Sequence, residues 1–127
     1  MAAVTHAARP LVVVVDDAHA LRLVMARALT EAGYDVLTAP DGLSATILIL
    51  GLRTSPDLVV TDLKMPAMDG EALAGWLAHH RPRVPVIFVS GFPGDRAELP
   101  GPLLPKPFTP DALTALVRET LGSRVMR

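Results

Sequence analysis

Apolar residues in this chain form short β-branched runs, and these runs alternate with longer segments of helical periodicity. A continuous apolar run is typical of a strand buried on both faces of a parallel sheet. Apolar residues spaced three and four positions apart indicate a helix with one buried face. We therefore expect strands at Leu11–Val15, Tyr34–Thr38, Leu58–Thr61 and Val84–Val89, with the stub of a fifth at Leu103–Leu104.

Helical segments lie between these strands. We expect them at Ala18–Ala32, Gly42–Gly51 and Glu71–His80, with a last helix after the fifth strand. Thr109 can cap that last helix, and Pro110 suits its first position. Strands alternating with helices imply parallel βαβ units with helices on both faces of the sheet. No linker or repeat divides the chain, so we expect one domain over residues 1–127, with its core at about 10–122 and frayed ends.

The segment Gly91–Pro102 departs from this alternation. It holds three prolines and three glycines, which leave only Asp95–Leu99 free to be helical. A parallel crossover normally needs a dozen or more residues, usually including a helix. The expected fold is thus α/β, a doubly wound five-stranded parallel sheet whose fourth helix is short or missing.

The composition excludes several classes of protein. Without cysteine, the chain has no disulfide, zinc–thiolate site or thiol catalysis. Its net charge of -1 gives no basic surplus for binding a nucleic-acid backbone. Residues 1–10 are too short and mixed for a signal peptide, and no apolar stretch approaches the length of a membrane span. We expect a cytoplasmic domain without nucleic-acid or membrane partners and, because no second domain follows Gly122, not a DNA-binding regulator.

Polar side chains stand where the apolar runs end. Asp16 and Asp17 follow the first run, Asp62 the third, Ser90 the fourth and Lys106 the fifth. In an open parallel sheet these ends lie side by side, and ligands bind there. Carboxylates at close range repel one another and become tolerable beside a divalent cation and a lysine. The set therefore predicts a phosphoryl site that depends on Mg²⁺ or Mn²⁺.

Each of these residues also has a plainer interpretation. Asp16 or Asp17 could cap the helix that follows, where Asp is common. Asp62 could be a loop carboxylate, Ser90 an ordinary strand-end serine, and Lys106 an exposed turn lysine. Against this, two acids follow four valines directly, and apolar neighbours make an unpaired charge at Asp62 costly.

The chemistry expected at Asp62 is nucleophilic. A carboxylate so placed can attack phosphorus and form an acyl phosphate. The backbone carbonyl of Lys64, two residues on, could be a further metal ligand. Lys106 is one of only two lysines against ten arginines, which hints at a need for a compact ammonium.

This ordered set, with Met65-Pro66 and Asp69-Gly70 after Asp62, resembles the receiver domain of two-component response regulators over about residues 10–122. The resemblance implies a flavodoxin-like fold with strand order 2-1-3-4-5. It implies a phosphoryl group accepted from a sensor histidine kinase or histidine phosphotransfer protein, with slow autodephosphorylation. Such a domain catalyses its own phosphorylation and dephosphorylation but is primarily a signalling switch, here expected as a monomer or weak dimer.

Individual roles follow from the resemblance. Asp62 matches the phosphoacceptor, and Asp17 matches the carboxylate that binds Mg²⁺ directly. Asp62 itself and the Lys64 carbonyl would complete the direct ligands, while Asp16 matches the acid that acts largely through water.

The switch residues match in part. Ser90 matches the hydroxyl switch residue, and Lys106 matches the lysine that pairs with the phosphoryl group. The family often carries Tyr or Phe three residues before that lysine, and here Leu103 replaces it, without a hydroxyl or a large ring. Together with the short Gly91–Pro102 segment, the pattern resembles stand-alone receivers and receivers of hybrid sensor histidine kinases.

Two other functions compete with this interpretation. A pseudo-receiver would bind partners without being phosphorylated, but all five polar positions are intact. A haloacid-dehalogenase-like phosphatase also uses an Asp nucleophile with Mg²⁺. That family needs a second acid two residues after the nucleophile, where this chain has Lys64.

Overall fold

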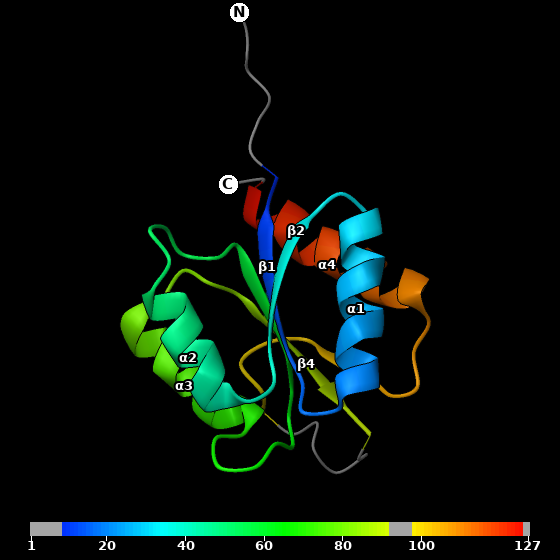
Figure 1. Cartoon of the computed structure of the whole chain (residues 1–127). Coiled ribbons are helices and arrows are strands. Elements are labelled where there is room, and N and C mark those ends of the chain that lie inside the picture. Colours follow the sequence, from blue (N-terminus) through cyan, green and yellow to red (C-terminus); the bar gives the residue numbers. More distant parts are fainter. Residues whose placement is uncertain (1–8, 92–97, 126–127) are drawn as a thin grey trace, which may run out of the picture.

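The computed structural model describes residues 9–91 and 98–125 of the chain. Five strands form one parallel sheet in the order β2-β1-β3-β4-β5, which confirms the expected topology (Figure 1). The strands are β1 (Leu11–Val15), β2 (Asp35–Ala39), β3 (Leu58–Asp62), β4 (Val86–Ser90) and β5 (Leu103–Pro105). The helices of the described residues are α1 (His19–Glu31), α2 (Gly42–Leu50), α3 (Gly70–His80) and α4 (Pro110–Val125).

Helices cover both faces of the sheet, so the core has two layers. Along β1, Val13 and Val15 pack in the cluster that includes side chains of α2 and α3. Val12 and Val14 pack in the cluster that includes α1 and α4. All four valines are fully buried. Because side chains alternate between the faces of a strand, a sheet covered on both faces needs the continuous valine run seen in the sequence.

Helix caps explain where three helices begin. The side chains of Asp41 and Asp69 accept hydrogen bonds from backbone amides in the first turns of α2 and α3. Thr109 Oγ1 accepts one from the amide of Ala112 at 3.1 Å, so the expected cap of the last helix is confirmed. Helix α1 has no side-chain cap, and its N-cap residue is Ala18.

The expected starts of two strands are wrong by one or two residues, and four strands end one residue later than expected. Tyr34 is not in β2, because its amide donates to the Leu29 carbonyl and closes the end of α1. The other expected start that is wrong is that of β4, which begins at Val86 rather than Val84. Val84 donates instead to the Arg81 carbonyl in a turn, and Pro85 has no amide proton to donate to a neighbouring strand.

The expectation of a short or missing fourth helix concerns residues 92–97, which lie outside the described residues. On either side, Gly91 and residues 98–102 form no helix. Gly101 lies against β4 so closely that a β-carbon there would overlap the carbonyl oxygen of Val86. In the part of the chain that is described, no helix is both long and apolar enough to cross a lipid bilayer.

Candidate functional site

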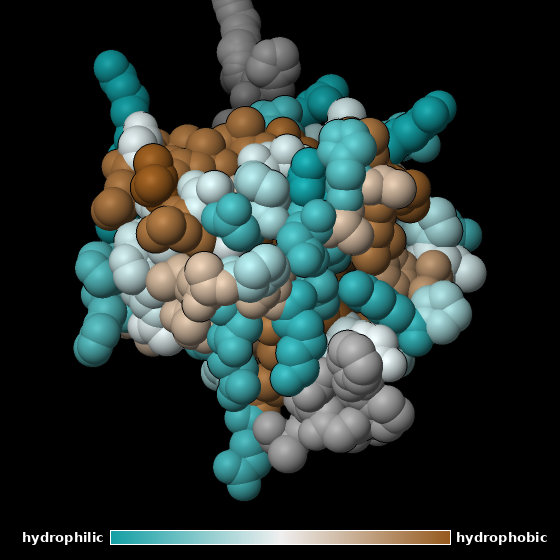
Figure 2. Space-filling view, turned by 60° about the horizontal axis from the view of Figure 1, so that its bottom comes forward, coloured by the Kyte–Doolittle hydropathy of each residue, from teal (hydrophilic) through white to brown (hydrophobic). Residues whose placement is uncertain are grey.

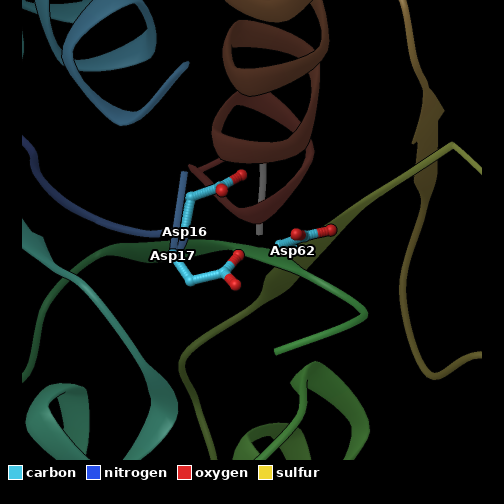
Figure 3. Close-up of side chains that lie close together, drawn as sticks. All are labelled: Asp16, Asp17 and Asp62. Carbon is cyan, nitrogen blue, oxygen red and sulfur yellow. The ribbon is translucent and has the colours of Figure 1, made fainter. Parts of the chain in front are cut away.

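Three carboxylates meet at the carboxyl end of the sheet (Figure 3). Asp16 and Asp17 directly follow β1, and Asp62 is the last residue of the neighbouring strand β3. One oxygen from each lies within 4.8 Å of the others. Asp16 and Asp62 are buried, at 0% and 6% exposure, whereas Asp17 is exposed. The parallel pairing of β1 and β3 thus brings Asp62 to an acidic pair more than forty residues earlier in the chain.

Asp16 does not cap the following helix. Its Oδ1 accepts a hydrogen bond from the amide of Ala18 at 2.8 Å, a side-chain turn that precedes α1. Its Oδ2 is buried and has no hydrogen-bond partner among the described residues. The interpretation of Asp16 or Asp17 as a helix cap is therefore wrong, and an oxygen of Asp16 remains available to a cation.

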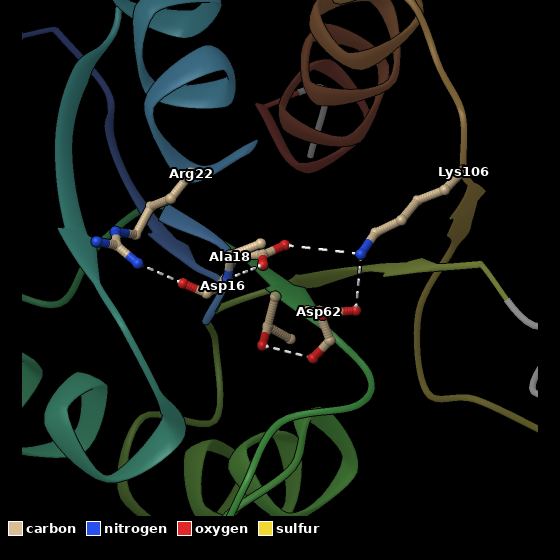
Figure 4. Close-up of polar contacts among 6 residues, drawn as sticks. Asp16, Ala18, Arg22, Asp62 and Lys106 are labelled. Atoms are coloured by element: carbon tan, nitrogen blue, oxygen red, sulfur yellow. Dashed lines mark hydrogen bonds and ion pairs between the residues drawn. The ribbon is translucent and has the colours of Figure 1, made fainter. Parts of the chain in front are cut away.

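Lys106 supplies the positive charge of the cluster (Figure 4). Its Nζ lies 3.4 Å from Oδ1 of Asp62 and 3.9 Å from Oδ2 of Asp16. The strand pairing accounts for this position, since the Lys106 amide donates to the carbonyl of Ser90 at 2.8 Å. The peptide bond between Lys106 and Pro107 is cis. The interpretation of Lys106 as an exposed turn lysine is wrong, because 28% of its side chain is exposed and it pairs with both acids.

Ser90 and Leu103, the other two expected switch positions, lie on β4 and β5. Ser90 is the last residue of β4 and is buried at the same edge of the sheet as Asp62. Leu103 pairs with Phe88 in the ladder between β4 and β5, and it packs against the core layer under α2 and α3. The position where the family often carries Tyr or Phe is thus occupied by a half-buried aliphatic side chain.

Burial raises the pKa of both inner carboxyl groups. Desolvation is the main cause at Asp62, and it outweighs the charge and hydrogen bond of Lys106 and the hydrogen bond from the Lys64 amide. Desolvation likewise raises the pKa of Asp16, against the hydrogen bond from the Ala18 amide, and the charge of Asp62 adds to the rise. Raised carboxyl pKa values mean that the cluster favours a bound proton or cation.

The donor atoms fit a hard divalent cation. Mg²⁺ prefers oxygen ligands, and the cluster offers only carboxylate oxygens, one of them a buried oxygen without a hydrogen-bond partner among the described residues. A family model for the response regulator receiver domain matches residues 12–99. The chain belongs to this family.

Known proteins similar to this receiver domain include sensor kinases and transcriptional regulators. It is 37% identical over 116 residues to the sensor kinase CckA of Brucella abortus, covering 87% of this chain and 12% of CckA. It is 34% identical over 120 residues to the transcriptional regulator NtrC of Escherichia coli K12, covering 90% of this chain and 25% of NtrC. The chain therefore spans a quarter or less of these curated relatives.

Solved structures agree with the fold. The receiver domain of the hybrid histidine kinase CckA matches with a TM-score of 0.75 and 35% identity, over 87% of this chain and 98% of that one. The response regulator TrrA of Thermotoga maritima, solved in complex with Mg²⁺ and BeF, matches with a TM-score of 0.78 and 26% identity, over 87% and 97%. Receiver domains bind Mg²⁺ through an acidic pocket, and this receiver has the corresponding cluster of aspartates.

The loop after Asp62 is held tightly in this receiver. The amide of Gly70 donates to the Leu63 carbonyl at 3.0 Å, and a β-carbon at Gly70 would overlap the carbonyl oxygen of Asp62. Ala67 has a φ of 67°, and the amide of Met68 bonds back to the Pro66 carbonyl at 2.8 Å. This is a γ-turn with a strained central residue.

Contact with α2 fixes the same loop from outside. A β-carbon at Gly42 would lie 2.6 Å from the carbonyl oxygen of Met68. Lys64, whose carbonyl is the expected metal ligand, is in this loop two residues after Asp62, with its side chain exposed. The loop that contains Lys64 is thus held to the end of β3 through Gly70 and lies against α2 at Met68.

The surface around the site is divided by polarity. The end of the molecule that carries the carboxyl ends of the strands is hydrophilic along its middle, with hydrophobic surface on both sides (Figure 2). Large apolar side chains that are more than half exposed include Leu43, Ile47 and Leu50 of α2 and Leu23 and Val24 of α1. Asp17 is exposed and Lys106 is partly exposed, so the acidic cluster is open to solvent at this end of the molecule.

Arg22 is a residue at the site that the sequence did not predict. Its guanidinium donates to the backbone carbonyl of Asp16 at 2.7 Å and lies 2.8 Å from Nδ1 of His19. A single arginine on a helix does not indicate, by its sequence position, that its side chain will bond to the site. Its position one turn after the acidic pair is the only sequence feature that could have suggested it.

Proposed function

We propose that this receiver domain accepts a phosphoryl group on Asp62 from a phosphohistidine, in a reaction that depends on Mg²⁺. The observation that carries the proposal is the buried carboxylate of Asp62, 3.4 Å from the Lys106 ammonium and within 4.8 Å of two further carboxylates. A histidine kinase or a histidine phosphotransfer protein would supply the phosphoryl group. We also propose that the domain acts in the cytoplasm as a monomer or weak dimer.

The transfer requires one bond to form and one to break. A carboxylate oxygen of Asp62 attacks phosphorus, the phosphorus–nitrogen bond of the donor breaks, and the freed imidazole takes up a proton. Little further covalent chemistry is needed, because positioning and electrostatics carry phosphoryl transfer. Later attack by water on phosphorus would release orthophosphate and restore the carboxylate.

Charge stabilisation is divided among the other residues. Lys106, already 3.4 Å from Asp62, would donate to a phosphoryl oxygen, and so would the hydroxyl of Ser90. Asp17, Asp62 and the Lys64 carbonyl would hold the cation, with Asp16 acting through water. When bound, Mg²⁺ neutralises negative charge on the phosphoryl oxygens.

The two rival functions have less support. A pseudo-receiver needs no intact cluster, yet here three carboxylates gather within 4.8 Å and the lysine lies within ion-pair distance of two of them. In a haloacid-dehalogenase-like phosphatase, the residue two positions after the nucleophile is an acid. In this chain it is Lys64, a base, and its side chain is exposed.

Intact-mass measurement tests the proposal. Incubated with acetyl phosphate or phosphoramidate and Mg²⁺, the wild type should gain one phosphoryl group and Asp62→Asn none. Asp57→Asn is the matched control, because it removes the same charge at the other end of β3, and it should be labelled like the wild type. Equal labelling of wild type and Asp62→Asn would contradict the assignment.

A further inference from the structure

Arg22 reaches back from the first turns of α1 to the turn that carries the acidic pair (Figure 4). Its Nη1 donates to the Asp16 carbonyl at 2.7 Å, and its Nη2 lies 2.8 Å from Nδ1 of His19. Its backbone amide donates to the Ala18 carbonyl at 2.9 Å. Arg22 therefore closes this turn with both its main chain and its side chain.

These bonds leave little freedom at Asp16. Its amide donates to the Ala39 carbonyl of β2 at 3.2 Å, and its carbonyl accepts from Arg22. Its Oδ1 accepts from the Ala18 amide. Only Oδ2 remains without a hydrogen bond among the described residues, 3.9 Å from Lys106. Backbone and side chain of Asp16 are thus fixed together, and Arg22 supplies the bond to the carbonyl.

The Asp16 carbonyl belongs to the peptide group that joins Asp16 to Asp17. A peptide group is planar, so holding its carbonyl also fixes the direction in which the chain enters Asp17. Asp17 is exposed, and its carboxylate joins the cluster within 4.8 Å. Rotation of this peptide would carry Asp17 away from Asp62 and would break the bond from Arg22.

Two cations near the site thus have different contacts. Lys106 lies against carboxylate oxygens of Asp16 and Asp62. The two contacts of the Arg22 guanidinium described above are with a carbonyl oxygen and a ring nitrogen, not with a carboxylate. A guanidinium fork suits such paired contacts, because its donors are held in one plane.

We propose that Arg22 is a positioning residue for the divalent cation, because it holds the Asp16–Asp17 peptide in the conformation that gathers the three carboxylates. This inference rests on the proposed Mg²⁺-dependent function. It also predicts the direction in which Mg²⁺ affinity changes when Arg22 is replaced. If Arg22 acted only as a nearby positive charge, its removal would strengthen Mg²⁺ binding; as a positioning residue, its removal weakens binding.

Calorimetric titration with Mg²⁺ measures the direction of this change in affinity. Arg22→Ala should bind Mg²⁺ about tenfold more weakly than wild type, as when a residue that orients a metal ligand is removed. Arg22→Lys should recover part of the affinity, because one ammonium can reach the Asp16 carbonyl but cannot reproduce the fork. His19→Ala should show a smaller loss than Arg22→Ala, because it removes only the second contact of the guanidinium.

Arg27→Ala is the matched control. Arg27 lies on the same helix, carries the same charge and pairs with Glu31 at 3.0 Å on the surface, so its loss should leave Mg²⁺ affinity equal or slightly higher. Melting in the presence of a chelator should show that Arg22→Ala and Arg22→Lys are folded, so that a loss of affinity is not a loss of structure.

Each outcome separates the two proposals. Affinity of Arg22→Ala equal to or above that of Arg27→Ala, with the wild type binding Mg²⁺, would overturn the role of Arg22 and leave the proposed function intact. Unfolding of Arg22→Ala together with wild-type affinity in Arg22→Lys and His19→Ala would overturn it too. A wild type that binds no Mg²⁺ would overturn both.

Discussion

The two ends of β3 carry the same residue type in opposite situations. At the amino end, Oδ2 of Asp57 accepts the amide of Leu11 at 2.7 Å, and the Asp57 amide donates to the Leu11 carbonyl at 2.8 Å. At the carboxyl end, Asp62 is buried and its pKa is raised by desolvation. Asp57 thus joins the start of β3 to β1 by two hydrogen bonds. Asp62, in contrast, is a carboxyl group whose burial disfavours its charged form. Stability and reactivity are therefore separated along one strand.

The largest expected effect is at the amino end. Asp57→Ala should lower the free energy of unfolding by about 2 kcal/mol, because a hydrogen bond to a charged acceptor is lost and the Leu11 amide is left in a partly buried place. Urea denaturation should give the same loss with and without Mg²⁺. Asp57→Asn keeps an oxygen acceptor and should lose less. A loss that Mg²⁺ abolished would contradict this difference between the two aspartates, since Asp57 would then belong to the metal site.

The carboxyl end should respond in the opposite direction. Asp62→Asn should raise the free energy of unfolding of the metal-free protein by about 1 kcal/mol, as is common when a destabilising functional residue is replaced. The reason is that a buried charge is removed. Mg²⁺ should stabilise the wild type more than the variant, by mass action. A variant less stable than wild type in the presence of a chelator would show that Asp62 contributes to folding as Asp57 does.

The smallest expected effect is the dependence of stability on pH. The pKa of Asp16 and of Asp62 is higher in the folded protein than in the unfolded chain. At any pH between the unfolded and the folded pKa of either group, the folded state therefore binds more protons. Their contribution to stability is therefore present at low pH and is lost as pH rises through the raised values. Without metal, the stability advantage of Asp62→Asn over wild type should shrink from neutral to mildly acidic buffer.

Groups outside the site are the same in both proteins, so their contributions cancel in this difference. Denaturant midpoints for wild type and Asp62→Asn, each with a chelator, measure it directly. An advantage that grew on acidification would mean that the Asp62 pKa is lowered in the folded state, and the contrast with Asp57 would disappear.

The sequence predicted the sheet because its signals are local. Valine runs such as Val12–Val15 can be buried only between two helical layers, and the alternation of elements then sets the topology. The same order of elements predicts that Asp16, Asp62 and Lys106 lie together at the carboxyl edge of the sheet. Strand ends were less predictable, because Val84 looks like a strand residue until the turn to Arg81 is seen.

Contacts between distant or surface residues could not be predicted. The bond from Arg22 to the Asp16 carbonyl depends on the rotamer of a long side chain, which leaves no periodic signal. Likewise, the sequence does not tell that Asp16 is buried and Asp17 exposed, nor that Gly42 has no room for a side chain beside Met68. Such facts come from close packing in three dimensions.

The composition of the carboxylate cluster has a consequence for charge balance. When all are ionised, three carboxylates and the Lys106 ammonium leave two negative charges, which one divalent cation cancels. An aspartyl phosphate carries about two negative charges where Asp62 carried one, so phosphorylation of the metal-bound site would restore one unit of negative charge. That unit would appear where Asp17 and Lys106 reach the surface, and would be screened within about 8 Å at physiological ionic strength. A partner that distinguishes the two states by charge must therefore come into contact with this part of the surface.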